Sequence, residues 1–156
     1  MYWIWKIEYG SPTTIYVLIG TTAQAQKEAF WNSLEDQCER KKQTPCFIAG
    51  DFNVTISADE RRVGSKIRDP FGERLEDLTL LWGLTDIKPK NGNFTWNNKR
   101  LGPGHIAATL DRVLVSTHLL KNLSFSESKL LCSAVLNHKP ICFFLSSVGN
   151  LGPLPF

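Results

Sequence analysis

The chain has 156 residues, of which 42% are hydrophobic and 21% are charged, with a formal net charge of +3. This length fits one domain with a substantial core, and the balance is that of a globular protein rather than a disordered one. No apolar stretch reaches the roughly 18 residues that a membrane span needs, and the weak positive charge is compatible with nucleic acid without arguing for it.

The first part of the chain predicts two strands, a helix and a third strand. Residues 2–9 and 14–20 are rich in aromatic and β-branched side chains, which is typical of strands, and Gly10-Ser11-Pro12 separates them as a turn. The short apolar run 46–49 ends at Gly50 and predicts a buried strand. Within residues 23–40 the apolar side chains recur with a period of about 3.6 residues, which predicts an amphipathic helix with a stripe of Ala25, Ala29, Phe30, Trp31, Leu34 and Cys38.

The second part predicts a surface loop, a helix and several short strands. Residues 55–69 are polar, and we interpret the charge cluster 59–62 as solvated surface rather than as a nucleic-acid contact. Asp69 as cap and Pro70 at the first helical position predict a helix over 71–82, which ends at Gly83. Its expected buried stripe is Phe71, Leu75, Leu78, Leu81 and Trp82. Short strands are expected at 84–87, 94–96, 110–115 and 141–145, so the chain is of the α/β class.

An acid and an amide follow the third strand. Asp51 and Asn53 lie two residues apart, so in an extended segment their side chains leave on the same side, while Phe52 faces the core. Ligands of open α/β sheets bind at the carboxyl ends of strands, which makes this pair a candidate polar corner of an active site. A simple turn capped by Asn53 is an alternative that the spacing leaves open.

A second acid, Asp111, interrupts an otherwise apolar strand. A buried carboxylate needs a partner, and the adjacent Arg112 leaves the strand on the opposite face. We therefore expect the partner to be His138, which stands just before the last strand. A carboxylate that orients an imidazole is the usual support of a catalytic histidine, although a single histidine is more often structural.

The order of these pieces resembles the endonuclease/exonuclease/phosphatase superfamily. The residues that carry the resemblance are Tyr9-Gly10-Ser11-Pro12, Phe30-Trp31, Gly50-Asp51-Phe52-Asn53, Phe94-Thr95-Trp96, Leu110-Asp111-Arg112 and Asn137-His138-Lys139-Pro140-Ile141. Within the superfamily the chain is similar to the endonuclease domain of plant LINE-type retrotransposons. The resemblance implies a two-sheet α/β sandwich that lacks its first strands. Residues 1–147 would form the C-terminal two-thirds of that domain and residues 148–156 a tail.

The resemblance also implies an activity, which is Mg²⁺-dependent hydrolysis of a DNA phosphodiester that leaves a 3′-hydroxyl. By resemblance, Asp51 would orient or activate the attacking water and Asn53 would hold a phosphate oxygen. His138, held by Asp111, would stabilise the charge that grows on the phosphate. Two further residues would contact the nucleic acid or its phosphate, namely Thr95 and Tyr9.

The chain departs from this family in the segments that would bind the metal. The strands that bring the family's asparagine and metal-binding glutamate would precede residue 1. Asn137 stands where the family has an acid, which leaves Asp51 and Asn137 as the expected metal ligands. A carboxamide is a poorer Mg²⁺ ligand than a carboxylate, so we expect Mg²⁺ binding to be weak or lost. The alignment of residues 10–27 is open, since a second register places Ile19-Gly20 at the tyrosine turn.

Three functions remain open at this point. The first is a retroelement-type endonuclease weakened or inactivated by truncation, and the second is a non-catalytic remnant of that domain. The third, a phosphoesterase of small phosphates, fits the surroundings of Thr95 and Asp111 less well. The expected partner is DNA, without a membrane or a small-molecule cofactor, and the oligomeric state is open. Four cysteines without C-x-x-C spacing and an N-terminus without signal-peptide order indicate an intracellular protein, with the nucleus as one candidate compartment.

Overall fold

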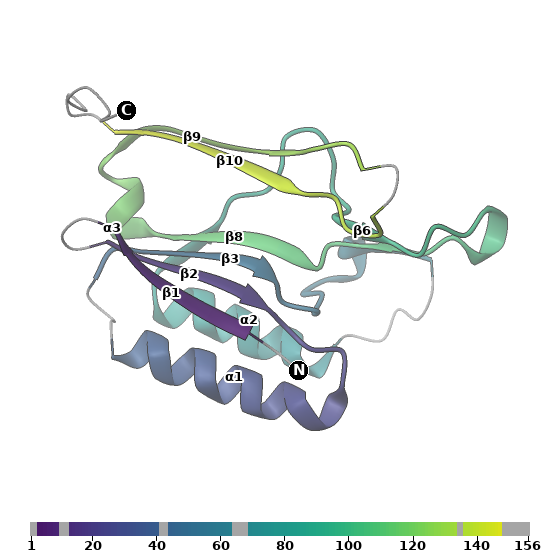
Figure 1. The fold of residues 1–156 in the computed structure, drawn as a ribbon, viewed down its shortest axis with the longest axis horizontal. Coiled ribbons are helices and arrows are strands. Elements are labelled where there is room, and N and C mark those ends of the chain that lie inside the picture. The colour runs from purple at the N-terminus through teal and green to yellow at the C-terminus, as the bar shows by residue number, and fades with distance from the viewer. Residues whose placement is uncertain (1–2, 10–12, 41–43, 64–68, 134–135, 148–156) are drawn as a thin grey trace.

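The computed structural model describes residues 3–9, 13–40, 44–63, 69–133 and 136–147. Figure 1 shows three layers, in which the two long helices lie on one side of a central sheet and a two-stranded sheet lies over the other. The predicted α/β class with two packed sheets is confirmed, and a small third sheet joins them. The expected tail 148–156 and the turn 10–12 lie outside the described residues.

The central sheet has five strands in the order β1-β2-β3-β8-β5. Their bounds are β1 Trp3–Tyr9, β2 Thr13–Ile19, β3 Cys46–Asp51, β8 Asp111–Ser116 and β5 Leu84–Asp86. Only β2 and β3 run parallel among these neighbours, because α1 (Gln24–Glu39) connects them, as a parallel pair requires. The other neighbouring pairs are antiparallel.

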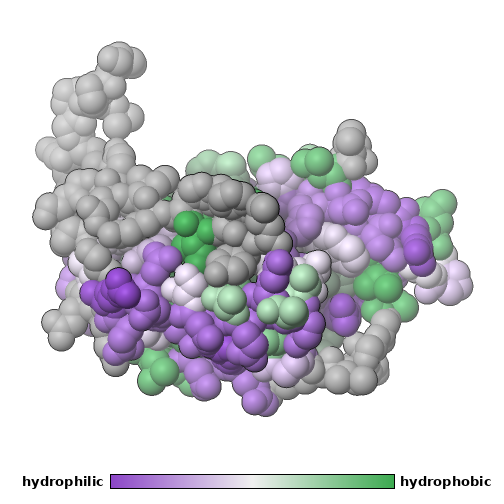
Figure 2. Space-filling model, turned by 60° about the horizontal axis from the view of Figure 1, so that its bottom comes forward, coloured by the Kyte–Doolittle hydropathy of each residue, from purple (hydrophilic) through white to green (hydrophobic). Residues whose placement is uncertain are grey.

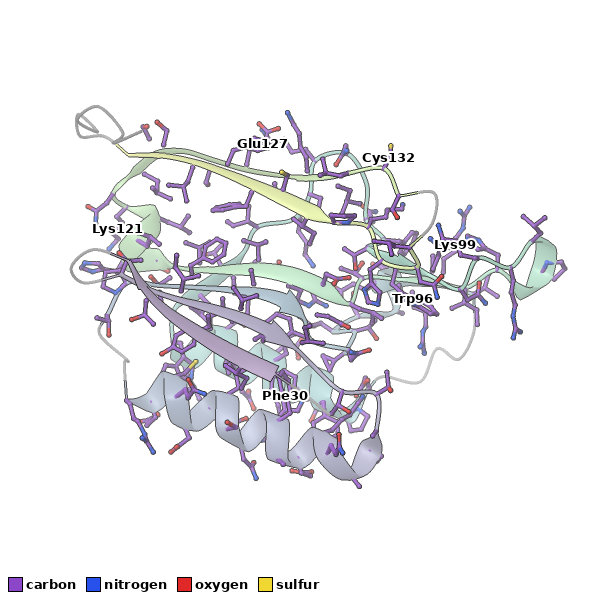
Figure 3. The ribbon with its side chains drawn as sticks, in the orientation of Figure 1. Phe30, Trp96, Lys99, Lys121, Glu127 and Cys132 are labelled. Carbon is purple, nitrogen blue, oxygen red and sulfur yellow. The ribbon has the colours of Figure 1, made fainter. Side chains whose placement is uncertain are left out.

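The core lies between this sheet and the helices α1 and α2 (Pro70–Leu81). Trp31 is fully buried, and its ring lies 6.4 Å from Phe71 and 6.2 Å from Phe52 between ring centroids. Phe30 points from α1 toward the sheet in Figure 3. The predicted cap of α2 is confirmed, because the Asp69 side chain accepts the amide of Phe71 at 3.0 Å.

The buried stripes are narrower than the sequence pattern predicted. Ala25, Ala29 and Leu81 are exposed, because they lie at the edges of the helical faces that contact the sheet. The outward side of the helices carries polar residues, and Figure 2 shows a largely hydrophilic surface there. Among the described residues, no helix is both long enough and apolar enough to cross a membrane.

Two small sheets complete the fold. β9 (Leu123–Leu130) and β10 (Ile141–Ser147) pair antiparallel, and the rings of Phe47 and Phe143 pack 5.1 Å apart between the layers. β4 (Arg61–Arg62), β7 (Ala107–Ala108) and β6 (Trp96–Asn97) form the third sheet. Short helical turns occur at Ala58–Glu60, at Gly102–Gly104 and at α3 (Thr117–Leu120). The expected surface loop over 55–69 therefore contains a 3₁₀ turn and a short strand.

One face of the central sheet carries exposed apolar side chains. Among the described residues β1 ends the strand order, and Val17 and Ile19 on neighbouring β2 are 38% and 46% exposed. A sandwich that lacks its first strands, as the resemblance implies, would leave the sheet incompletely covered and Trp3 and Trp5 of β1 exposed. The side chains of Trp3 and Trp5 lie outside the described residues, so that part stays a prediction.

Candidate active site

The site begins where β3 ends, at Asp51. The register pairs Asp51 directly with Asp111 at the start of β8, so two carboxylates become cross-strand neighbours. On the other side of β3, Gly50 lies very close to the backbone of β2. Its φ is +142°, and a Cβ atom there would lie 1.9 Å from the carbonyl oxygen of Leu18. Phe52 then turns into the core, 1% exposed, as predicted.

Asp51 and Asn53 are joined by a tight turn rather than by an extended segment. Asn53 has a φ of 52°, in the left-handed region that asparagine tolerates. Its backbone amide donates to Asp51 Oδ1 at 2.9 Å and its Nδ2 donates to Asp51 Oδ2 at 2.8 Å. The two side chains meet as expected, but a turn brings them together, and its capping side chain is Asp51 rather than Asn53. Lys27 Nζ holds the Asn53 carbonyl at 3.4 Å and Asp69 Oδ2 at 3.2 Å.

Asp111 contacts the ring of His138 in the predicted manner. The Nδ1 atom of His138 lies 3.0 Å from Asp111 Oδ2 and 3.2 Å from Oδ1. With Nδ1 as the donor, Nε2 faces Asp51, whose Oδ2 lies 3.9 Å away. The carboxylates are mostly shielded, with Asp51 14% and Asp111 17% exposed, while the His138 side chain is 41% exposed. The structure therefore brings together Asp51, Asn53, Asp111 and His138.

The environment that the two carboxylates share raises the pKa of Asp51. Burial, and then the charge of Asp111, raise the pKa of Asp51 to about 6, although the hydrogen bonds from Asn53 and the nearby His138 act in the opposite direction. A carboxyl group that exchanges its proton near neutral pH is suited to general base chemistry.

Thr95 holds the backbone next to this site through hydrogen bonds. It is fully buried, and its hydroxyl accepts the amides of Leu110 and Asp111, each at 3.0 Å. Its carbonyl accepts the amide of Lys139 at 2.7 Å, next to His138. A direct contact with nucleic acid, which the resemblance implied for Thr95, requires exposed surface that this side chain lacks. Its hydroxyl instead fixes the strand start that carries Asp111.

Two further expected site residues are Asn137 and Tyr9. The Asn137 side chain is exposed, and its carbonyl accepts the amide of Asn97 at 3.0 Å, so its role as a metal ligand stays a prediction. Tyr9 ends β1, and its side chain lies outside the described residues.

Glu60 is a residue whose importance the sequence interpretation missed. It was assigned to a solvated charge cluster, yet Glu60 is only 8% exposed and forms an ion pair with the fully buried Arg112. The signal that could have revealed the pair was Arg112 itself, since an arginine inside an apolar strand requires a carboxylate. The neighbours Asp59, Arg61 and Arg62 are exposed, as expected of a solvated cluster.

A basic arm projects beside the site. It comprises residues 98–106 between β6 and β7, and Figure 1 shows it extending away from the body. Lys99 lies at its base in Figure 3. Arg100 and His105 of the arm, together with Arg62 of β4, line a hollow of about 430 Å³. The two guanidinium groups, those of Arg62 and Arg100, make this hollow suited to an anionic ligand.

The donor atoms at the centre of the site fit a divalent cation. Asp51, Asp111 and His138 each offer one ligand atom, and these atoms lie within 4.8 Å of one another among the described residues. Two carboxylates and an imidazole suit ions such as Mn²⁺, whereas Mg²⁺ prefers oxygen ligands and retained water. The set thus fits a divalent metal, with Mg²⁺ matched less well than Mn²⁺.

The chain matches the sequence pattern of the endonuclease/exonuclease/phosphatase family over residues 12–130. A Xenopus laevis protein described as an uncharacterized 149 kDa protein of transposon TX1 is 28% identical over 129 residues, which is 79% of this chain. The chain spans 10% of the length of that relative.

Solved structures share the fold. The endonuclease domain of TRAS1, a telomere-specific non-LTR retrotransposon, matches 92% of this chain with a TM-score of 0.61 at 18% identity. The 3′-5′ exonuclease NExo from Neisseria meningitidis matches 92% of this chain with a TM-score of 0.63 at 16% identity. The 3′ phosphatase NExo bound to a product DNA hairpin matches 87% with a TM-score of 0.65 at 17% identity. The chain spans 63%, 64% and 62% of those three chains.

Proposed function

Because this chain belongs to the endonuclease/exonuclease/phosphatase family, we propose that it is a DNA endonuclease of the retroelement type whose metal-dependent step is weak. The observation that carries the proposal is the convergence of Asp51, Asn53, Asp111 and His138 at one sheet edge. The TX1 and TRAS1 likenesses support the retroelement type, and the DNA-bound neighbour and the basic arm support DNA as the substrate. A nuclear site of action belongs to the same proposal.

The residues divide the work of phosphodiester hydrolysis. Asp51, with its raised pKa, accepts the proton of the attacking water. One Nδ2 proton of Asn53 is used by Asp51, and the other is available to a phosphate oxygen. When protonated, His138 Nε2 donates to the phosphoryl oxygen that gains charge, while Asp111 holds the ring through Nδ1.

A divalent ion held by Asp51, Asp111 and His138 would supply neutralisation of the phosphate charge in place of the His138 proton, because Nε2 cannot bind an ion and donate a proton at the same time. Two of these donors are already engaged, Asp111 with His138 and Asp51 with Asn53. Binding of the ion therefore competes with hydrogen bonds that the site already has. This competition, together with an imidazole in the donor set, is why we expect Mg²⁺ to support little activity and Mn²⁺ to support more.

The test is nicking of supercoiled plasmid with Mg²⁺, with Mn²⁺ and with a chelator. We expect nicking near background in Mg²⁺ and above background in Mn²⁺, with loss in Asp51→Ala and in His138→Ala. Asp36→Ala is the matched control, since Asp36 on α1 is exposed and among the contacts described its side chain pairs only with Arg40, the C-cap residue of that helix. Nicked plasmid that primes a DNA polymerase would establish the 3′-hydroxyl product.

Two outcomes contradict the proposal. If the protein is folded, as cooperative unfolding would show, and nicks DNA with neither Mg²⁺ nor Mn²⁺, a non-catalytic remnant of the family domain is favoured. Nicking that survives in Asp51→Ala would show a contaminating nuclease.

Asn137→Asp should restore little activity in Mg²⁺, because one added carboxylate leaves the existing donors engaged as before.

A further inference from the structure

Arg112 is a fully buried charge next to the site. Its side chain has 0% exposure, with Nη1 bound to Glu60 Oε1 at 2.9 Å and to Asp86 Oδ2 at 2.8 Å, and Nη2 bound to Glu60 Oε2. Lys88 joins the group, at 2.6 Å from Glu60 and 3.0 Å from Asp86. Two cations and two carboxylates therefore balance in charge.

Glu60 connects this ion cluster to both halves of the site. Its Oε2 accepts the amide of Ile56 at 2.7 Å, in the segment that follows Asn53. Its carbonyl accepts the amide of Thr109 at 2.9 Å, two residues before Asp111. Glu60 therefore joins the loop that carries Asn53 to the strand start that carries Asp111.

Stability alone gives a weak reason for such a cluster. Replacing a buried ion pair by apolar side chains of similar volume is often neutral or stabilising, because burial of two charges is costly. Arg112 Nε also lacks a partner within the described part of the chain, which adds to that cost. What the ion pair offers is fixed geometry, since the guanidinium fork and a carboxylate bind in one orientation.

We propose that Arg112 and Glu60 are positioning residues that hold the Asn53 loop and the Asp111 strand start in register, so that Asp111 can orient the ring of His138. The proposal rests on the proposed function for the identity of the reacting groups. Neither side chain touches the substrate site itself, and the effect passes through Ile56, Thr109 and the backbone.

The test is the tautomer ratio of the neutral His138 ring, measured by long-range ¹H–¹⁵N correlation of histidine-labelled protein without metal. Donation from Nδ1 to Asp111 makes the Nδ1–H form dominant. In Glu60→Gln/Arg112→Met, which removes both charges of the pair together, we expect the ratio of the Nδ1–H to the Nε2–H form to fall about tenfold, as for loss of one well-aligned charge-assisted hydrogen bond. His105 and His118 serve as internal references.

The control removes another two-nitrogen ion pair, which is partly exposed and lies between the helices. Arg74 binds Glu35 through two nitrogens, at 2.8 and 2.6 Å, between α2 and α1. Glu35→Gln/Arg74→Met should leave the His138 ratio unchanged. Arg112→Lys keeps the charge without the fork, so it should give an intermediate ratio, and it also tests the proposal if the double variant fails to fold.

The outcomes separate the two proposals. A folded Glu60→Gln/Arg112→Met variant, or a folded Arg112→Lys variant, with the wild-type His138 ratio would overturn the positioning role. A changed ratio in a protein that never nicks DNA would support the positioning role and count against the endonuclease only.

Discussion

At the scale of single residues, the site depends on groups held in environments that alter their ordinary chemistry. Asp51 is a shielded carboxyl group beside a second carboxylate, and its pKa is raised to about 6. Thr95 is buried, and its hydroxyl accepts hydrogen bonds from two backbone amides. Both features can be tested without any assumption about catalysis.

Asp51→Asn should stabilise the metal-free protein at neutral pH. Because the folded pKa lies above the unfolded value of 3.8, the native state binds the proton more tightly, and stability falls as pH rises from about 4 to about 6. At pH 8 the wild-type protein bears the full cost of a buried, ionised Asp51. The free energy of unfolding of the variant should therefore be higher by about 1 to 2 kcal/mol, after allowance for a lost hydrogen bond from Asn53. Urea unfolding in chelator at pH 8 and pH 4 measures the gain.

The gain should vanish at pH 4, where the wild-type carboxyl group is already neutral. Asp36→Asn, at an exposed position on α1, should change stability little at either pH. A variant that is equally stabilised at both pH values would mean that ionisation of Asp51 is not the cause.

Thr95→Val should destabilise the protein by about 2 to 3 kcal/mol, because two buried amides lose their acceptor while the side-chain shape is kept. Thr95→Ser keeps the hydroxyl and removes one methyl group, so it should cost about 1 kcal/mol. Denaturant unfolding of both variants decides the matter, and a serine variant less stable than the valine variant would contradict the assigned role.

At the scale of elements, the site depends on how closely β2 and β3 approach at Gly50. Gly50, the last but one residue of β3, has a positive φ, and the carbonyl of Leu18 occupies the space that a side chain would need. Immediately afterwards the Asp51 carbonyl accepts the amide of Gly20 at 2.5 Å. The end of β3 is thus fixed on its β2 side before the chain turns at Asn53.

Gly50→Ala should be severely destabilising, by about 4 kcal/mol or more, because the new methyl group overlaps backbone that cannot move freely. Gly104→Ala in the basic arm is the control, since its nearest neighbour is the flexible Arg100 side chain at 3.8 Å. Soluble yield and thermal unfolding by circular dichroism compare the two. A Gly50→Ala protein as stable as Gly104→Ala would refute the close approach.

At the scale of the whole molecule, cationic side chains lie both at the basic arm and far from it. Arg62 and Arg100 line the hollow at the basic arm, while the labelled Lys121 lies at the opposite end of the molecule in Figure 3. If the arm contacts DNA phosphates, cations there should matter more than equal charges elsewhere, because each phosphate contact releases bound counterions.

Arg62→Ala/Arg100→Ala should weaken binding to duplex DNA and reduce the slope of log affinity against log salt by up to about 2, since each contact contributes about 0.9. Fluorescence anisotropy at several salt concentrations measures the slope. Arg40→Ala/Lys121→Ala removes the same formal charge from exposed positions away from the arm. Equal slopes for the two double variants would show that the arm is not a DNA contact.

The sequence by itself determined most helices and strands and one side-chain contact between them. Helical periodicity, the Asp69 cap and the turn residues act through near neighbours in the chain, so local pattern was enough to place α1, α2 and most strands. The Asp111–His138 contact could also be predicted, because a carboxylate in an apolar strand must find a partner and Arg112 faces the other way.

Only the tertiary structure decided the roles of Thr95, Glu60 and Arg112. The partners of Arg112 lie 52 and 26 residues away in sequence, and the hydroxyl of Thr95 acts 15 and 16 residues along the chain. A charged run such as 59–62 has the same pattern whether its carboxylate faces water or a buried arginine. Burial and long-range hydrogen bonds arise only when the layers pack, and that packing fixes which polar side chains form the site and which ones hold it.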